Sequence, residues 1–329
     1  MSDLLPLIQL NHVGKQFGQT NPSIWQKMGL AKRKPVTTAV DDVNLSIYKG
    51  EVVGLVGESG CGKSTLGRMV AGIIQPSQGQ VLIKGQDWHS LHGKALSEAR
   101  LTVQMVFQDP YASLNPRMRV QEIVGESPYQ HGLVSKKKLD AYVSEQLERG
   151  GLSASLRYRF PHQFSGGQRQ RIGIARALAV KPEMLVCDEA VAALDVSIQA
   201  QIINLFMDLR EQLNLTYLFI SHDLSVVEHF SDRVVIMYLG KVVESGKVEE
   251  IYQHPNHPYT RALLAERPKM NERKKIFSAL KGEIPSPLNP PSGCHFHPRC
   301  PYATERCKQE VPVLKEVAIQ HFSACHLND

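Results

Sequence analysis

The sequence predicts an α/β fold, in which short buried strands alternate with helices. Three apolar runs have the composition of buried strands and end at glycine, acidic or hydroxyl-bearing residues, namely residues 52–56, 184–187 and 216–220. Between the last two runs, residues 196–213 have the apolar periodicity of an amphipathic helix. The 329 residues are enough for one large or two ordinary domains that bury a real core.

Strand signals also come early in the chain. Residues 7–13 and 40–47 read as strands, and a hairpin is expected around residues 79–84. Residues 18–35 are a polar, basic insertion between the first two strands. Residues 101–107 form another apolar strand, which Pro110 terminates.

Residues 111–165 differ in character, because they contain few β-type runs. Helix-like patterns cover residues 120–125 and 135–149, so a helical insertion is expected here. After residue 254 the chain has a short predicted helix at 259–266, a proline-rich stretch at 282–291 and a tail that holds four of the six cysteines.

Composition excludes a membrane-spanning chain, since no apolar run approaches the ~20 residues that a spanning helix needs. The first residues lack the basic and apolar regions of a signal peptide. We therefore expect a cytoplasmic protein that reaches a membrane only through partners. The net charge of +6 is modest.

The stretch after the first buried strand fits the pattern G-x-x-x-x-G-K-[ST] of a phosphate-binding loop. It consists of Gly57, Glu58, Ser59, Gly60, Cys61, Gly62, Lys63, Ser64 and Thr65. A strand precedes it and a helix-compatible run follows, which is the context that the motif requires. Glycines let backbone N–H groups point at phosphates, Lys63 can reach the β- and γ-phosphates, and Ser64 can bind Mg²⁺.

A pair of acids follows the strand at residues 184–187. Asp188 is expected in the Mg²⁺ shell, and Glu189 is expected to orient and deprotonate the attacking water. Such a pair next to a cation leaves one carboxylate as ligand and the other as base.

A second glycine-rich run, formed by Ser165, Gly166, Gly167 and Gln168, opens a predicted helix. Its amides form a second anion cradle at a helix N-terminus. With Phe164 before it, this run resembles the signature sequence of ATP-binding-cassette (ABC) ATPases, and it lies between the other two motifs. The resemblance implies that it binds the γ-phosphate of ATP on a partner subunit.

Three more residues match that family in order. Gln108 resembles the glutamine that contacts Mg²⁺ or the attacking water, and Asp195 lies in a stretch similar to the D-loop. His222 resembles the switch histidine that pairs with the γ-phosphate and Glu189. Ala192 replaces the usual small polar residue of the D-loop, which removes at most one hydrogen bond of ~1 kcal/mol.

The family stacks adenine on an aromatic residue upstream of the phosphate-binding loop. Phe17, at the end of the first strand, is the preferred candidate and Trp25 the alternative, although Phe17 could equally pack against its neighbours. A separate hypothesis concerns Cys61, because a thiol at a helix N-terminus beside Lys63 is expected to have a lowered pKa and to be reactive.

Longer segments, among them residues 107–116, 193–201, 220–227, 254–263 and 282–298, resemble the ATPases of dipeptide and oligopeptide importers, closest to the F-type subunit. The resemblance implies a P-loop NTPase fold with a RecA-like core, an antiparallel β subdomain, a helical subdomain and a small Cys-rich C-terminal extension. We expect the nucleotide-binding domain over residues 1–255, with the helical subdomain at about 109–170, and the extension over 256–329.

The cysteines of the tail, Cys294, Cys300, Cys307 and Cys325, have the spacing C-x₅-C-x₆-C-x₁₇-C. Structural zinc prefers tighter pairs. Some members of the importer family carry a [4Fe–4S] cluster in this extension, and loose thiolate spacing suits one. We predict a [4Fe–4S] cluster, with Zn²⁺ or free thiols as the alternatives.

The resemblance implies an ATP-hydrolysing subunit at the cytoplasmic face of the inner membrane. Its expected partners are a second ABC ATPase, two transmembrane permease subunits and an extracytoplasmic substrate-binding protein. A paralogous ATPase, which gives a heterodimer, is the preferred second subunit, and a homodimer is the alternative. Peptides are the expected cargo, and nickel or glutathione are alternatives. A soluble ABC ATPase that acts on nucleic acid is the rival class, but no coiled coil, DNA-binding zinc module or tandem cassette accompanies the motifs. An ATP-sensing regulator is less expected, because Glu189 is present.

Overall fold

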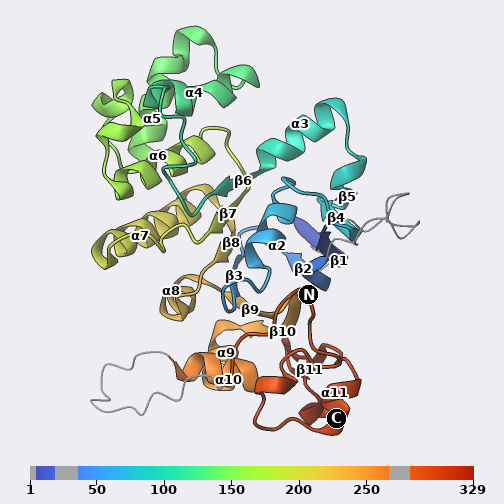
Figure 1. Ribbon diagram of the computed structural model, residues 1–329. Helices are drawn as coiled ribbons and strands as arrows, with labels where there is room; N and C mark the ends of the chain where they lie inside the picture. The colour runs from blue at the N-terminus through green and yellow to red at the C-terminus, as the bar shows by residue number, and fades with distance from the viewer. Residues whose placement is uncertain (1–4, 19–35, 267–281) are drawn as a thin grey trace, which may run out of the picture.

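The computed structural model describes residues 5–18, 36–266 and 282–329, which form two β-sheets with helices around them (Figure 1). The strands are β1 Ile8–Phe17, β2 Thr37–Ile47, β3 Val52–Val56, β4 Gln78–Ile83, β5 Gln86–Asp87, β6 Val103–Val106, β7 Met184–Asp188, β8 Thr216–Ile220, β9 Arg233–Tyr238, β10 Lys241–Lys247, β11 Lys315–Ala318 and β12 His321–Ser323. Among the described residues the larger sheet has the order β11-β12-β10-β9-β3-β8-β7-β6, and the smaller one has the order β2-β1-β4-β5. Strands β6, β7, β8, β3 and β9 are parallel, whereas the smaller sheet is antiparallel.

Helices cover the larger sheet and form a group of their own at one end. The α-helices are α2 Lys63–Val70, α3 Gly93–Thr102, α4 Val120–Gln130, α5 Leu139–Arg149, α6 Gly166–Leu178, α7 Val196–Leu213, α8 Leu224–Phe230, α9 Val248–Gln253, α10 Pro258–Ala265 and α11 Glu305–Gln309. Short 3₁₀ turns are η1 Trp88–Ser90, η2 Lys136–Lys138, η3 Ala154–Tyr158, η4 Pro161–Gln163, η5 His297–Arg299 and η6 His326–Asn328. None of the helices in the described ranges is long and apolar enough to cross a membrane.

Both faces of the central parallel strands are buried, which explains their continuous apolar runs. In β3, Val53 and Leu55 pack into the core shared with the smaller sheet and α2. Val52 and Val56 pack on the other face, in a core that also contains Phe206 of α7. The predicted α/β fold is therefore confirmed at its centre. The strand predicted from residue 101 begins only at Val103, because α3 continues through Thr102.

Helices α4, α5 and α6 share a separate apolar core, and in Figure 1 this green group lies at the end opposite the red C-terminal part. Val124, Val143 and Ile172 are fully buried in that core. Helix α4 continues five residues beyond the predicted end at 125 and contains Pro128 in its last turn. The exact domain and subdomain boundaries stay predictions.

The end of the chain adds strands to the larger sheet. Strand β12 pairs antiparallel with β10, with Ser323 opposite Glu244, and β11 pairs with β12. His321 and Glu244, both buried, lie 2.7 Å apart between Nε2 and Oε1. The C-terminal residues are thus part of the main sheet, whereas a small Cys-rich extension was expected over residues 256–329. A three-residue strand carries too little periodicity to be recognised.

Candidate functional site

The phosphate-binding loop links β3 to α2, and two of its glycines are required by its geometry. Gly57 has φ 154°, and a Cβ there would lie 2.2 Å from the carbonyl oxygen of Met237. Gly62, the N-cap of α2, has φ 106°, and its Cβ would lie 2.1 Å from the carbonyl oxygen of Ala39. Any other residue would clash with backbone at both positions, so the loop can pack this closely only with glycine.

Lys63 is buried, and its side chain turns back over the loop. Nζ donates hydrogen bonds to the carbonyl oxygens of Gly57 at 2.8 Å and Glu58 at 2.9 Å. These bonds satisfy the buried ammonium while keeping it in the concave side of the loop. A phosphate that enters the loop would meet a positive charge already in place.

Ser64, one residue further, connects α2 to the end of β7. Its hydroxyl donates a hydrogen bond to Oδ1 of Asp188 at 2.7 Å. Burial raises the pKa of Asp188, while the Ser64 hydrogen bond and the positive charges of Arg68 and Lys63 oppose that rise. The hydroxyl and the carboxylate are hard oxygen donors of the type that Mg²⁺ binds.

Glu189 lies at the turn directly after β7 and has φ 47°, a left-handed conformation that glutamate rarely adopts. Its backbone N–H donates to the carbonyl oxygen of Ile220 at 3.0 Å, which ties the turn to the end of β8. Its carboxylate accepts a hydrogen bond from Nε2 of Gln108 at 2.8 Å. His222 lies further away, with Nδ1 at 3.7 Å from Oε2 of Glu189, and its side chain is 60% exposed.

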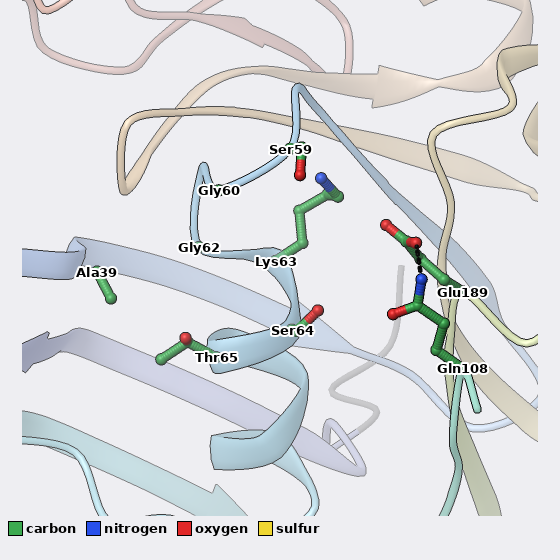
Figure 2. A pocket seen from close by; sticks show the side chains of 9 residues that line it. All are labelled: Ala39, Ser59, Gly60, Gly62, Lys63, Ser64, Thr65, Gln108 and Glu189. Carbon is green, nitrogen blue, oxygen red and sulfur yellow. Dashed lines mark hydrogen bonds between the residues drawn. The ribbon is translucent and has the colours of Figure 1, made fainter. Parts of the chain in front are cut away.

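Lys63, Ser64, Gln108 and Glu189 lie around one cavity of about 260 Å³, drawn in Figure 2, whereas Asp188 and His222 do not line it. Lys63 and Ser64 lie on its loop side, and Gln108 and Glu189 lie on the facing side (Figure 2). The cavity is lined by Ala39, Ser59, Gly60, Gly62, Lys63, Ser64, Thr65, Gln108 and Glu189. Ala39 was not predicted, because a small residue on β2 carries no chemical signal. The arrangement presents cationic and N–H groups opposite a carboxylate, as a site that binds phosphate and activates water requires.

Other predicted residues do not line this cavity. Ser165 caps α6, accepting a hydrogen bond from the N–H of Gln168 at 3.3 Å, and Gly166 and Gly167 form the first turn. Asp195 precedes α7 and is exposed, as are Ser165, Gly166 and Gln168.

The structure describes only one of the two candidates for stacking on adenine. Phe17, at the end of β1, is 45% exposed, and Nζ of Lys15 lies 5.4 Å from its ring centroid. Trp25 lies outside the described residues.

The hypothesis of a lowered Cys61 pKa is wrong. The side chain is only 2% exposed, and burial raises the pKa of its thiol despite the opposing charge of Lys63. The Sγ atom packs against Gly57, where an added Cβ would lie 2.8 Å away. The thiol therefore points into the protein beneath the loop, and the loss of hydration outweighs the nearby cation.

The predicted [4Fe–4S] cluster is also wrong. Cys294, Cys300, Cys307 and Cys325 line one small cavity, so the fold does gather them. However, within the part of the chain that the structure describes, no group of three or more His, Cys, Asp or Glu side chains could hold a metal ion. The same finding applies to the zinc alternative. Burial raises the pKa of Cys294 to about 11, which favours the thiol over the thiolate that binds metals.

Comparisons with known proteins agree with the geometry. The profile described as "ABC transporter" matches residues 40–192, and "Oligopeptide/dipeptide transporter, C-terminal region" matches residues 243–307. The oligopeptide transport ATP-binding protein AppF of Bacillus subtilis is 51% identical over 98% of this chain and 97% of its own length. The chain belongs to the ATP-binding subunits of oligopeptide ABC transporters.

Further comparisons support this oligopeptide-transporter ATPase assignment. The oligopeptide transport ATP-binding protein OppF of Haemophilus influenzae is 46% identical, over 97% of this chain and 96% of its own. Among solved structures, the dimeric ATP-binding cassette MJ0796, in a post-hydrolysis state with ADP and Pi, has a TM-score of 0.63 and 28% identity, covering 73% of this chain and 98% of that one. CbiO1 from Clostridium perfringens also reaches a TM-score of 0.63, at 25% identity, covering 76% and 91%. These matches confirm the P-loop NTPase core and the ABC ATPase activity class.

Proposed function

We propose that this chain hydrolyses ATP at the cavity beside the phosphate-binding loop and thereby powers the import of peptides. The proposal rests on two hydrogen bonds near Lys63. These are the Ser64–Asp188 hydrogen bond at 2.7 Å and the Gln108–Glu189 hydrogen bond at 2.8 Å. One supplies a cation site and the other a held base. Ser64, Gln108 and Glu189 line the same cavity, and Asp188 lines a second cavity that shares Ser64 and Gln108 with the first.

The loop residues bind the triphosphate in this proposal. The backbone N–H groups of Ser59, Gly60 and Gly62, which line the cavity together with Thr65, would donate to phosphate oxygens. Ser64 and Asp188, with Gln108 nearby, are the residues that would hold Mg²⁺. A bound Mg²⁺ would neutralise negative charge on the phosphates.

Glu189 acts as the base on water. Its carboxylate accepts a proton as the water oxygen forms a bond to the γ-phosphorus and the bond to the β,γ-bridging oxygen breaks, which leaves ADP and phosphate. Gln108 donates a hydrogen bond to Oε2 of Glu189, and Nδ1 of His222 lies 3.7 Å from the same oxygen. The Glu189 side chain is only 18% exposed, which limits its contact with bulk water and strengthens its interaction with the attacking molecule.

The exposed residues outside the cavity serve a second ATPase subunit. Ser165, Gly166, Gly167 and Gln168 form the N-terminus of α6 at the surface, and Asp195 is exposed at the start of α7. A γ-phosphate bound to a partner subunit fits that helix N-terminus. The similarity to the F-type subunit supports a paralogous partner and a heterodimer.

The remaining partners follow from the family. Two permease subunits would contact the group formed by α4, α5 and α6, together with residues 111–118, where Tyr111 is exposed. A substrate-binding protein would deliver cargo on the other side of the membrane, so this chain would lie at the cytoplasmic face. Phe17 would stack on adenine. The names of the relatives support peptides as cargo over nickel and glutathione.

Uptake measurements in the source organism test both the site and the cargo. Cells that carry only a Lys63→Ala chain should lose uptake of labelled di- and oligopeptides and keep uptake of nickel and glutathione. Lys181→Ala, at an exposed lysine before β7, is the matched control and should transport normally. Loss of nickel or glutathione uptake with normal peptide uptake would refute the peptide assignment, and normal uptake of all cargo would refute the site.

A further inference from the structure

The C-terminal part of the chain reaches the phosphate-binding loop directly. Arg299 forms a two-pronged ion pair with Glu58, the second residue of the loop, with Nη1–Oε2 at 2.6 Å and Nη2–Oε1 at 3.0 Å. The Arg299 side chain is only 4% exposed and that of Glu58 19%. A bidentate, water-shielded pair of this kind holds both side chains in one geometry.

A second residue from the same end of the chain holds the backbone of Glu58. The Glu58 N–H donates a hydrogen bond to the hydroxyl of Tyr259, on α10, at 2.9 Å. Its carbonyl oxygen accepts from Lys63 at 2.9 Å. The N–H, the carbonyl and the carboxylate of this one loop residue are therefore all fixed, two of them by residues after 255.

An aromatic cluster supports both contacts. Tyr238, Tyr259 and Phe296 are fully buried, with ring centroids 4.7 Å apart for the two tyrosines and 5.3 Å apart for Tyr238 and Phe296. Phe296 precedes Arg299 by three residues, and the Tyr238 hydroxyl lies 3.4 Å from Nη1 of Arg299. The position of the guanidinium is thus set by packing that includes β9, α10 and the C-terminal segment.

The charge of Glu58 makes this contact relevant to nucleotide binding. A carboxylate on a loop that receives a triphosphate repels its ligand unless a cation neutralises it. Arg299 neutralises it without entering the cavity, which neither Arg299 nor Glu58 lines. Without Arg299, the partly buried carboxylate of Glu58 would be an unpaired negative charge on the loop that binds the phosphates.

We propose that Arg299 and Tyr259 are positioning residues through which the C-terminal segment shapes the phosphate-binding loop, masks the Glu58 charge and so sets the affinity for ATP. The inference rests on the proposed nucleotide site and adds two residues outside the cavity that affect its affinity for ATP. It assigns to the segment that contains Arg299 a role in binding nucleotide, although that segment supplies no atom to the cavity.

Binding of a fluorescent ATP analogue to the full chain tests the proposal. Arg299→Met should weaken binding about tenfold, which corresponds to ~1.4 kcal/mol. Adding Glu58→Gln in the same chain should restore most of the affinity, because the unpaired charge is gone.

Two further variants serve as a matched control and as a second test of the segment. Arg306→Met removes a guanidinium from the same segment that pairs, among the described residues, with Glu310 and Asp329, and this variant should bind within about twofold of wild type. Tyr259→Phe removes only the hydroxyl and should weaken binding several-fold, in a chain whose aromatic packing is retained. Thermal unfolding of each variant shows whether it is folded, and Tyr259→Phe decides the question if Arg299→Met does not fold.

The outcomes distinguish a failure of the proposed nucleotide site from a failure of the role proposed for the C-terminal segment. If wild type binds and Lys63→Ala does not, the nucleotide site stands. Equal binding by wild type, Arg299→Met and Tyr259→Phe then overturns the role of the C-terminal segment alone. A loss in Arg299→Met that Glu58→Gln fails to reverse overturns the charge argument. A wild-type chain that binds no analogue overturns the site and this inference together.

Discussion

Replacing Glu189 with glutamine removes the carboxylate that the mechanism uses as a base and keeps nearly the same shape. The amide oxygen of the glutamine can still accept the hydrogen bond that Nε2 of Gln108 donates at 2.8 Å. The contacts of Lys63 and Ser64 do not involve Glu189, so ATP binding should stay within a few-fold of wild type. Loss of a general base costs about 10²–10⁴ in rate, and we expect hydrolysis to fall at least about 100-fold.

The measurement is phosphate release by the assembled transporter, with nucleotide binding measured separately on the same preparation. Glu211→Gln, at an exposed position of α7, is the matched control and should hydrolyse ATP normally. Turnover within about tenfold of wild type would refute Glu189 as the base, since such a loss is smaller than general-base catalysis supplies. Parallel loss of binding and hydrolysis would show instead that the carboxylate shapes the cavity.

Three further predictions follow from single side chains. Phe17→Ala should weaken ATP binding about tenfold, because stacking on a base contributes ~1–3 kcal/mol, and unchanged affinity for a fluorescent ATP analogue would reject stacking. Cys61 should react slowly with N-ethylmaleimide in the folded chain and quickly in urea, since its thiol is buried with a raised pKa; rapid labelling of the native protein, followed by peptide mass spectrometry, would contradict this. His257 is buried with its pKa lowered to about 3, so the unfolded chain, near 6.5, binds a proton that the folded one does not. Titration of His257 should therefore leave the free energy of unfolding unchanged above pH ~6.5. Below that pH it should lower the free energy of unfolding, by up to ~1.4 kcal/mol per pH unit, down to pH ~3. His257→Asn, which keeps an acceptor for the Tyr259 N–H, should flatten that decline in urea unfolding, and an unchanged pH dependence would count against the assignment.

The residues around the cavity could be predicted because each follows a recognisable strand. Lys63 comes after β3, Gln108 comes after β6, and Asp188 and Glu189 lie at the end of β7, so these residues follow three apolar runs that belong to one parallel arrangement. Parallel strands end at the same edge of the sheet, so the polar residues that follow them meet there. The sequence pattern therefore predicted that these residues lie close together. Their roles in hydrolysis stay predictions.

Other features depend on contacts that have no local pattern. Arg299 and Glu58 are separated by 241 positions, and neither residue differs in type from an ordinary surface charge. The burial of Cys61 depends on its packing beneath the loop, which reverses the effect that Lys63 beside it would have in water. The cysteines of the tail do meet at one cavity, but spacing alone carried no information on whether their thiols could hold a metal ion.

The pairing of β12 with β10 also determines what the larger sheet offers to other proteins. If the chain ended before residue 315, the N–H and C=O groups that β10 now shares with β12 would be unpaired along an edge strand. Such an edge recruits strands from other molecules and promotes aggregation. Among the described residues the edge of this sheet is β11, a short strand that carries the exposed charges of Lys315 and Glu316 and is poorly suited to that pairing. Strands β11 and β12 thus cover β10 against sheet-to-sheet self-association.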